Sequence, residues 1–192
     1  AIFSFGSVSL TNATLSGNIA PDGNSGGIHI YNNTLTLKNT IIANNNGGDC
    51  ILSGTSSIGA GSSHNLLKST GAEACGLTNG ASNNVIGSDP NFGILTGSPA
   101  YLPLNSGSPA IDTASDATCI AAPVSNTSQN GVTRPQGDHC DIGAYEFDNI
   151  PAATSSVRAS ASPTSATSVD FTVTFSESVI GVDPGDFTLT IT

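Results

Sequence analysis

The 192-residue chain is acidic and sparsely charged: 14 Asp and Glu stand against four Lys and Arg, the net charge is −10, and only 9% of residues carry a charge. Nucleic acid is excluded as a partner, because neutralising phosphates needs a basic face that four cations cannot supply. With 27 Ser, 21 Thr, 18 Asn and 22 Gly, the chain depends on hydroxyl and amide groups for its solubility. No stretch is long and apolar enough to span a membrane, and because there is no Met, residue 1 is interpreted as a processing or fragment boundary.

The first predicted element is a repeat. Residues 7–18, SVSLTNATLSGN, recur without a gap as TLTLKNTIIANN at 34–45, a period of 27 residues that places Leu10 on Leu37. Short alternating strands at a fixed period, separated by Asn and Gly, are typical of a solenoid, whose coils bury their apolar faces by stacking. The pattern predicts a three-sided parallel β-helix in which Asn side chains stack at equivalent bends. The predicted pairs are Asn12 with Asn39 and Asn18 with Asn45.

Residues 26–33, GGIHIYNN, predict a short strand with Ile28 and Ile30 on the inner face and His29 and Tyr31 on the outer face. The two outward rings could stack against a sugar. The favoured interpretation is an exposed pair in which the Tyr31 ring covers a neighbouring coil.

The coils contain few groups that could do chemistry. Their only carboxylates are Asp22 and Asp49, and their only basic side chains are His29 and Lys38. Glycoside hydrolysis needs two carboxylates within roughly 5–9.5 Å, which stacked coils could provide because Asp22 and Asp49 share the repeat register. Both lie in Gly- and Asn-rich bends, where Asp forms turns, so the turn role is favoured and no catalytic residue is predicted.

Residues 50–150 lose the period and predict an irregular region packed on the last coils. The four cysteines allow three pairings, and nearest-neighbour pairing would join Cys50 to Cys75 and Cys119 to Cys140. Each such loop would stabilise the fold by roughly 3 kcal/mol in the loop-entropy model. Because no C-x-x-C metal spacing occurs, disulfides are favoured over free thiols, which indicates an oxidising compartment.

Several short motifs follow one another in a characteristic order along the first 148 residues. They are NTIIANNNGGDC (39–50), NLL (65–67), Cys75, SDPNFG (88–93), LNSGSPAID (104–112) and GVTRPQGDHCDIGAYEF (131–147). This series resembles the C-terminal end of bacterial right-handed β-helix surface proteins, in the region known as choice-of-anchor Q, over roughly residues 7–148. The resemblance implies an extracellular, anchored protein with a parallel β-helix core, and it implies no reaction. Residues 119–131 depart from the family pattern as an insertion.

Charged residues of the closing motif and the C-terminal region are interpreted as structural. Arg134 is expected to pair with Asp138, Asp141 or a carbonyl group and so to fix its loop, rather than to contact a substrate. Two carboxylate pairs, Asp138 with Asp141 and Asp183 with Asp186, could bind Ca²⁺ through oxygen ligands. Neither has the spacing of an EF-hand, so no metal or cofactor is predicted and calcium stays an alternative.

Residues 155–192 alternate between apolar and polar positions, which predicts strands. This stretch is similar to the opening strands of bacterial immunoglobulin-like modules, and because a full sandwich takes about 100 residues, only part of one is expected. Residues 149–154 are the predicted linker. The residues expected on shared faces are Val169, Phe171, Val173 and Phe175, and then Phe187, Leu189 and Ile191.

The predicted fold is all-β: the end of a right-handed parallel β-helix with an irregular disulfide-pinned cap region (1–148), the linker, and a partial immunoglobulin-like β element (155–192). The expected function is that of a non-enzymatic extracellular protein, structural or adhesive, at the cell surface. Expected partners are copies of the chain itself, other surface or matrix components, and glycans. The rival classes are a carbohydrate-active β-helix enzyme, either a polysaccharide lyase or a hydrolase, and a glycan-binding module.

The strands near both ends of the sequence would expose unpaired backbone groups and apolar side chains. If residues 1 and 192 are natural termini, we expect head-to-tail assembly into a filament by β-strand addition. The alternative is that the chain is a piece of a longer anchored protein. The predicted assembly residues are Phe3, Phe5, Val8, Leu10, Phe187, Leu189 and Ile191.

Overall fold

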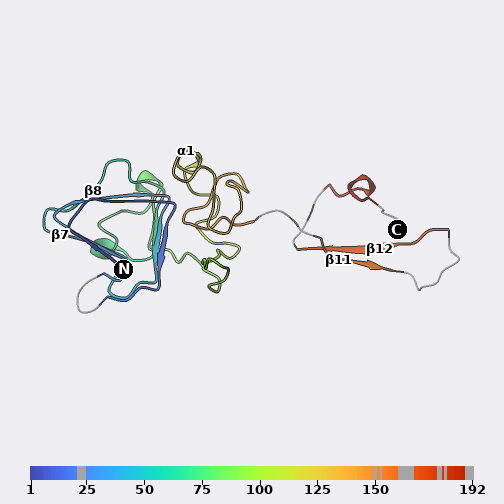
Figure 1. The fold of residues 1–192 in the computed structure, drawn as a ribbon, viewed down its shortest axis with the longest axis horizontal. Coiled ribbons are helices and arrows are strands. Elements are labelled where there is room, and N and C mark those ends of the chain that lie inside the picture. The colour runs from blue at the N-terminus through green and yellow to red at the C-terminus, as the bar shows by residue number, and fades with distance from the viewer. Residues whose placement is uncertain are drawn as a thin grey trace. The chain divides into compact units, whose positions relative to one another are not determined.

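The fold is described by a computed structural model, covering residues 1–20, 25–148, 151, 153–159, 167–176, 179 and 181–188 (Figure 1). The chain divides into two compact units, residues 1–148 and 149–192. Among the described residues, no helix has the length and apolar character needed to cross a membrane.

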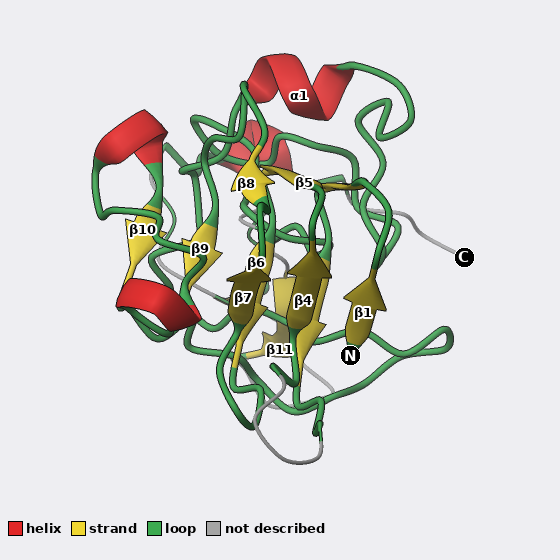
Figure 2. Cartoon of the chain, turned by 90° about the vertical axis from the view of Figure 1, so that its left-hand side faces the viewer, coloured by secondary structure: helices red, strands yellow, loops and turns green. Residues whose placement is uncertain are grey.

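Unit 1 is a parallel β-helix with three sides, and each side is a parallel sheet to which successive coils contribute one strand. In Figure 2, β7, β4 and β1 lie side by side and point the same way. The first sheet contains β1 (Ile2–Ser4), β4 (Ile28–Tyr31) and β7 (Cys50–Ser53), and the second contains β2 (Val8–Thr11), β5 (Thr34–Lys38) and β8 (Ser57–Ile58). The third contains β3 (Thr14–Ser16), β6 (Ile41–Ala43), β9 (Leu66–Leu67) and β10 (Val85–Ile86).

The strand register confirms the predicted repeat. Leu10 pairs with Leu37 between β2 and β5, and Leu15 pairs with Ile42 between β3 and β6. Leu37 and Ile42 are fully buried in the interior of the helix. The 27-residue period therefore corresponds to one circuit of the backbone.

Asparagine ladders hold the bends in register, as predicted. Asn12 and Asn39 both adopt left-handed backbone angles, with φ of 45° and 48°, and Asn39 Nδ2 donates to Asn12 Oδ1 at 3.2 Å. At the next bend, Asn18 Nδ2 donates to Asn45 Oδ1 at 3.0 Å. A further ladder, from Asn65 Nδ2 to Asn84 Oδ1 at 3.0 Å, was not predicted.

The prediction that regular structure ends near residue 50 was wrong, because β7, β8 and β9 form a third coil and β10 adds one more strand to the third sheet. The third coil pairs Ile28 with Cys50 and Ile41 with Leu66, both at separations shorter than 27 residues. Its bends are shorter than those of the first two coils. A search at a fixed period therefore misses it.

The third sheet is buried on both faces. Ile42 and Leu67 point into the interior of the helix, while Ile41 and Leu66 form a second core with residues from the irregular part of the chain. We call residues 88–148 the closing region, in which the only helix longer than three residues is α1 (Asp116–Ile120). Two short 3₁₀ turns, η1 (Gly71–Glu73) and η2 (Ala81–Asn83), lie before it. Buried closing-region residues in this second core are Leu104, Ala110, Ala114, Cys119, Cys140 and Ile142.

The closing region extends along the flank of the β-helix as far as the first coil. The prediction that it packs only on the last coils was therefore wrong. The Ala144 amide donates to Thr14 Oγ1 at 3.0 Å, and the Gly143 amide donates to the Asn39 carbonyl at 2.8 Å. Disulfides join Cys50 to Cys75 and Cys119 to Cys140, which is the nearest-neighbour pairing. One disulfide therefore ties the third coil to the turn that follows it, and the other closes a loop within the closing region.

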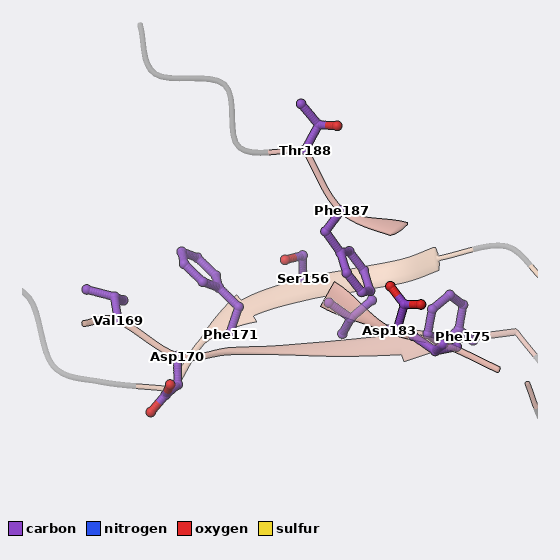
Figure 3. A pocket seen from close by; sticks show the side chains of 10 residues that line it. Ser156, Val169, Asp170, Phe171, Phe175, Asp183, Phe187 and Thr188 are labelled. Carbon is purple, nitrogen blue, oxygen red and sulfur yellow. The ribbon is translucent and has the colours of Figure 1, made fainter. Parts of the chain in front are cut away.

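Unit 2 contains an antiparallel pair, β11 (Ala153–Arg158) with β12 (Phe171–Phe175), and the turn η3 (Pro184–Asp186). Val169, Phe171, Val173 and Phe175 share one face, as expected, and line an open concavity of about 860 Å³ together with Phe187 (Figure 3). Leu189 and Ile191, and part of the predicted linker, lie outside the described residues.

Candidate functional site

The closing motif builds the densest polar cluster of the described chain around Arg134, whose side chain is buried. Arg134 Nη1 donates to Glu146 Oε2 at 3.0 Å and to the Asp141 carbonyl at 2.9 Å. Its Nη2 donates to the carbonyls of Gly143 and Tyr145 at 2.9 and 3.1 Å. The planar guanidinium thus fixes one turn of backbone in the way predicted from the sequence, through carbonyl groups.

The carboxylate partner of Arg134 is Glu146, which the sequence analysis did not single out. Glu146 Oε1 accepts from the Gln136 amide, and Oε2 accepts from the Asp141 amide, each at 3.0 Å. Asp141 was named as a candidate partner, and it contributes its carbonyl group instead. Asp138 is exposed.

Asp141 is itself a buried acceptor. Its Oδ1 accepts from the Asp112 amide at 2.9 Å and its Oδ2 from the Phe147 amide at 2.6 Å, so one carboxylate ties two distant loop segments together. Burial raises the pKa of Asp141 to about 7, and burial also raises the pKa of Glu146. The cluster holds two carboxyl groups and one guanidinium, and it has no face open to a substrate.

A pocket of about 480 Å³ lies where the turn around η2 meets the closing region, and two of the chain's three histidines line it. His139 Nδ1 lies 2.7 Å from Asp116 Oδ2, and this hydrogen bond raises the pKa of His139. Across the pocket, His64 Nε2 contacts Asn83 Nδ2 at 2.9 Å, and burial lowers the pKa of His64. His64 Nδ1 is buried and has no hydrogen-bond partner among the described residues.

This pocket escaped the sequence analysis because its histidines are far apart in the chain, and the motif that contains His139 (131–147) was interpreted as structural. The only available signal was the scarcity of histidine itself, with three in 192 residues.

Three of the carboxylates considered for catalysis or calcium, those of Asp49, Asp183 and Asp186, accept hydrogen bonds from backbone amides. Asp49 is buried and accepts from the Asn45 side-chain amide at 3.0 Å and from the Ser69 amide at 2.7 Å, in agreement with a turn role. Asp22 lies outside the described residues. In unit 2, the Asp183 amide donates to Asp186 Oδ2 at 2.9 Å, and Asp183 Oδ1 accepts from the Gly185 amide. Within the described ranges, no three His, Cys, Asp or Glu side chains are grouped so as to hold a metal ion.

For the two outward rings of β4, the prediction is confirmed for Tyr31 and wrong for His29. Tyr31 is 41% exposed and its ring contacts Phe5 of the preceding coil, with centroids 5.7 Å apart. The prediction that His29 is exposed was wrong: it is 9% exposed, lies under Phe3, and bonds Ser53 Oγ at 2.8 Å. The alternation of residues in β4 shows which side chains point outward, but it does not show that Phe3 of β1 covers His29.

The predicted assembly residues of the first coil divide between two faces. Val8 and Leu10 pack against the core, whereas Phe3 and Phe5 point outward and are 54% and 68% exposed.

The fold and these contacts define a disulfide-bonded parallel β-helix whose flank is covered by an irregular closing region. Comparisons with protein-family models, with curated proteins and with solved structures gave no match.

Proposed function

We propose that the chain is a non-enzymatic, extracellular structural and adhesive protein. The observation that carries this proposal is the use of the closing motif: Arg134, Glu146 and Asp141 are turned inward and bonded to backbone groups. A buried cluster of this kind specifies one arrangement of a loop-rich segment, and it does not present charge to a substrate.

The motif order in the sequence supports a more specific placement within this proposal. The chain would belong with bacterial β-helix surface proteins of the choice-of-anchor Q type, followed by the start of an immunoglobulin-like module. Two disulfides fit an oxidising location outside the cytoplasm.

A polysaccharide lyase or hydrolase is the second candidate, because His139, which is paired with Asp116, lines an open pocket. To separate the two, the chain is incubated with pectate, alginate and neutral glycans, with and without calcium, and new reducing ends and unsaturated products are measured. We expect no turnover beyond that of a heat-denatured control. Turnover that His139→Ala abolishes would establish the enzyme and refute the structural proposal.

Self-assembly is the remaining part of the proposal. Among the described strands, β1, β2 and β3 each lie at one end of their sheet, which is where a further strand would pair by β-strand addition. Sedimentation velocity over a range of concentrations tests this, with a chain lacking residues 187–192 as the comparison. Loss of polymers on truncation supports strand addition through that segment, and polymers of unchanged size argue against it.

A further inference from the structure

Four ring side chains form a cluster on the outer face of the first sheet and the bend that follows β1, and we call Phe3, Phe5, His29 and Tyr31 the aromatic face. Phe3 pairs with His29 between β1 and β4. Phe3 contacts both Phe5 and His29 with ring centroids 5.1 Å apart, and all contacts in the cluster are edge-to-face. Such packing fixes the orientation of each ring on the sheet.

His29 is the buried member of the aromatic face, and the other three rings are exposed to solvent. His29 is held by Ser53 and covered by Phe3, so it forms a fixed base. Above it, Phe3, Phe5 and Tyr31 remain about half exposed. Aromatic rings held open to solvent in this way are ready contact groups, because little side-chain freedom is lost when a ligand covers them.

Hydrogen-bonding groups without charge border the rings. Asn33 Nδ2 donates to the Phe5 carbonyl at 3.0 Å, and Asn33 Oδ1 accepts from Ser7 Oγ. The outward positions of the three strands carry no carboxylate, ammonium or guanidinium group. These positions are Phe3, His29, Tyr31, Ile51 and Ser53.

A partner must therefore be apolar on one side, rich in hydrogen-bonding groups on the other, and uncharged. Three half-exposed rings offer roughly 300 Å² of aromatic surface. A stable protein interface needs roughly 800 Å² from each partner, so a second copy or another protein fits this face less well than a small ligand. A pyranose ring has an apolar C–H face and a rim of hydroxyl groups, which is the required combination.

We propose that the aromatic face binds a neutral polysaccharide, with Phe5 and Tyr31 contacting neighbouring sugar residues. The coils repeat about every 4.8 Å, a distance comparable to the length of one sugar residue in a chain. This inference rests on the proposed adhesive role, for which it names the ligand class.

Affinity electrophoresis and isothermal titration of the whole chain against β-glucan, xylan and galactomannan test the inference, with pectate as the charged comparison. Phe5→Ala and Tyr31→Ala should each weaken binding to the preferred neutral glycan at least tenfold. Ile94→Ala and Leu95→Ala are matched controls, because these apolar side chains are also exposed, at 88% and 61%, and belong to the closing region rather than to the first sheet. The controls should bind within twofold of the parent chain.

Absence of binding to all three neutral glycans overturns the inference, as does equal binding of the Phe5→Ala chain or preference for pectate. If Phe5→Ala instead lowers the sedimentation coefficient of an assembled species, the face is a contact between copies and the inference is wrong. All of these results leave the non-enzymatic proposal standing, since only the turnover assay decides that. Circular dichroism verifies that each variant is folded.

Discussion

Replacing Arg134 by Met should destabilise unit 1 more than any surface substitution. The change removes the only cation among two buried carboxyl groups, together with four hydrogen bonds to Glu146 and to three carbonyl groups. Removing one member of a buried ion pair costs about 3–5 kcal/mol, because the remaining charge is left without a partner in the protein interior, where the dielectric constant is low. That is a large part of the 5–15 kcal/mol by which a domain is usually stable.

Urea unfolding measures this loss. With a slope of about 2 kcal/mol per molar urea, a loss of 3–5 kcal/mol lowers the midpoint by about 1.5–2.5 M. Far-ultraviolet circular dichroism follows the coils. Tyrosine fluorescence follows mainly the closing region, which holds two of the three tyrosines, Tyr101 and Tyr145, with their rings 5.5 Å apart. The chain contains no Trp, so tyrosine emission is observed directly.

Lys68→Met is the matched control, because Lys68 forms an ion pair with Asp89 at 2.6 Å in which both side chains are about half exposed. Such surface pairs contribute about 0–1 kcal/mol, so the midpoint should shift by less than about 0.5 M. If Arg134→Met shifts the midpoint no more than this control, the closing cluster does not stabilise the fold and the argument fails. Should Arg134→Met not fold, Arg134→Lys keeps the charge, loses the fork of donors, and should fall between the two.

Three further predictions concern stability. The folded-state pKa of Asp141 lies at about 7, above its ordinary value of 3.8. Between these two pH values the folded chain binds more protons than the unfolded chain, so the free energy of unfolding should fall as pH rises from 4 to 7. The fall should reach at most about 4 kcal/mol, and Asp141→Asn should flatten it in urea titrations at several pH values. The double variant Cys119→Ser/Cys140→Ser should lose about 3 kcal/mol in the same assay, and an unchanged midpoint would contradict the disulfide. Gly27→Ala should lower the melting temperature measured by calorimetry by several degrees, because a Cβ atom there would lie 2.0 Å from the Asp49 carbonyl oxygen and such a clash costs about 1–3 kcal/mol. Gly107→Ala is the comparison, because a Cβ atom there meets no other atom while φ is 80°, so this variant measures backbone strain without a clash.

The coils could be predicted wherever the chain repeats itself. The register of Leu10 on Leu37 and the ladder of Asn12 on Asn39 follow from a gap-free alignment of two segments. The third coil could not be found in this way, since its bends are shortened and only the apolar pairs of β9 and β10 remain as a signal. Local alternation gives the faces of a strand, but it does not say which neighbouring coil covers them, and for that reason His29 was misplaced.

The closing region was predictable in role and only partly in detail. Arginine among several Asp residues indicated a loop-fixing contact, and its carbonyl bonds agree. The identity of the partner depends on which carboxylate the turns bring within reach, and Glu146 lies twelve residues along the chain from Arg134. Similarly, His64 and His139 meet in one pocket only because the closing region folds back over the turn around η2. Contacts of this kind are set by tertiary packing, which spacing in the sequence does not encode.

The sequence does encode which side of the β-helix is covered. A strand with one open face alternates, as in Ile28-His29-Ile30-Tyr31, where only the Ile side chains face the interior. A strand buried on both faces reads as adjacent apolar residues, and the third sheet carries such a pair in each later coil. The pairs are Ile41-Ile42, Leu66-Leu67 and Val85-Ile86. The closing region packs on that sheet because its outer face is apolar. The first sheet is left uncovered by the closing region, and three of its outward positions carry rings, Phe3, His29 and Tyr31. We therefore expect a ligand to contact the exposed aromatic rings on the side of the β-helix that the closing region does not cover. Substitutions of Phe5 and Tyr31 test this expectation.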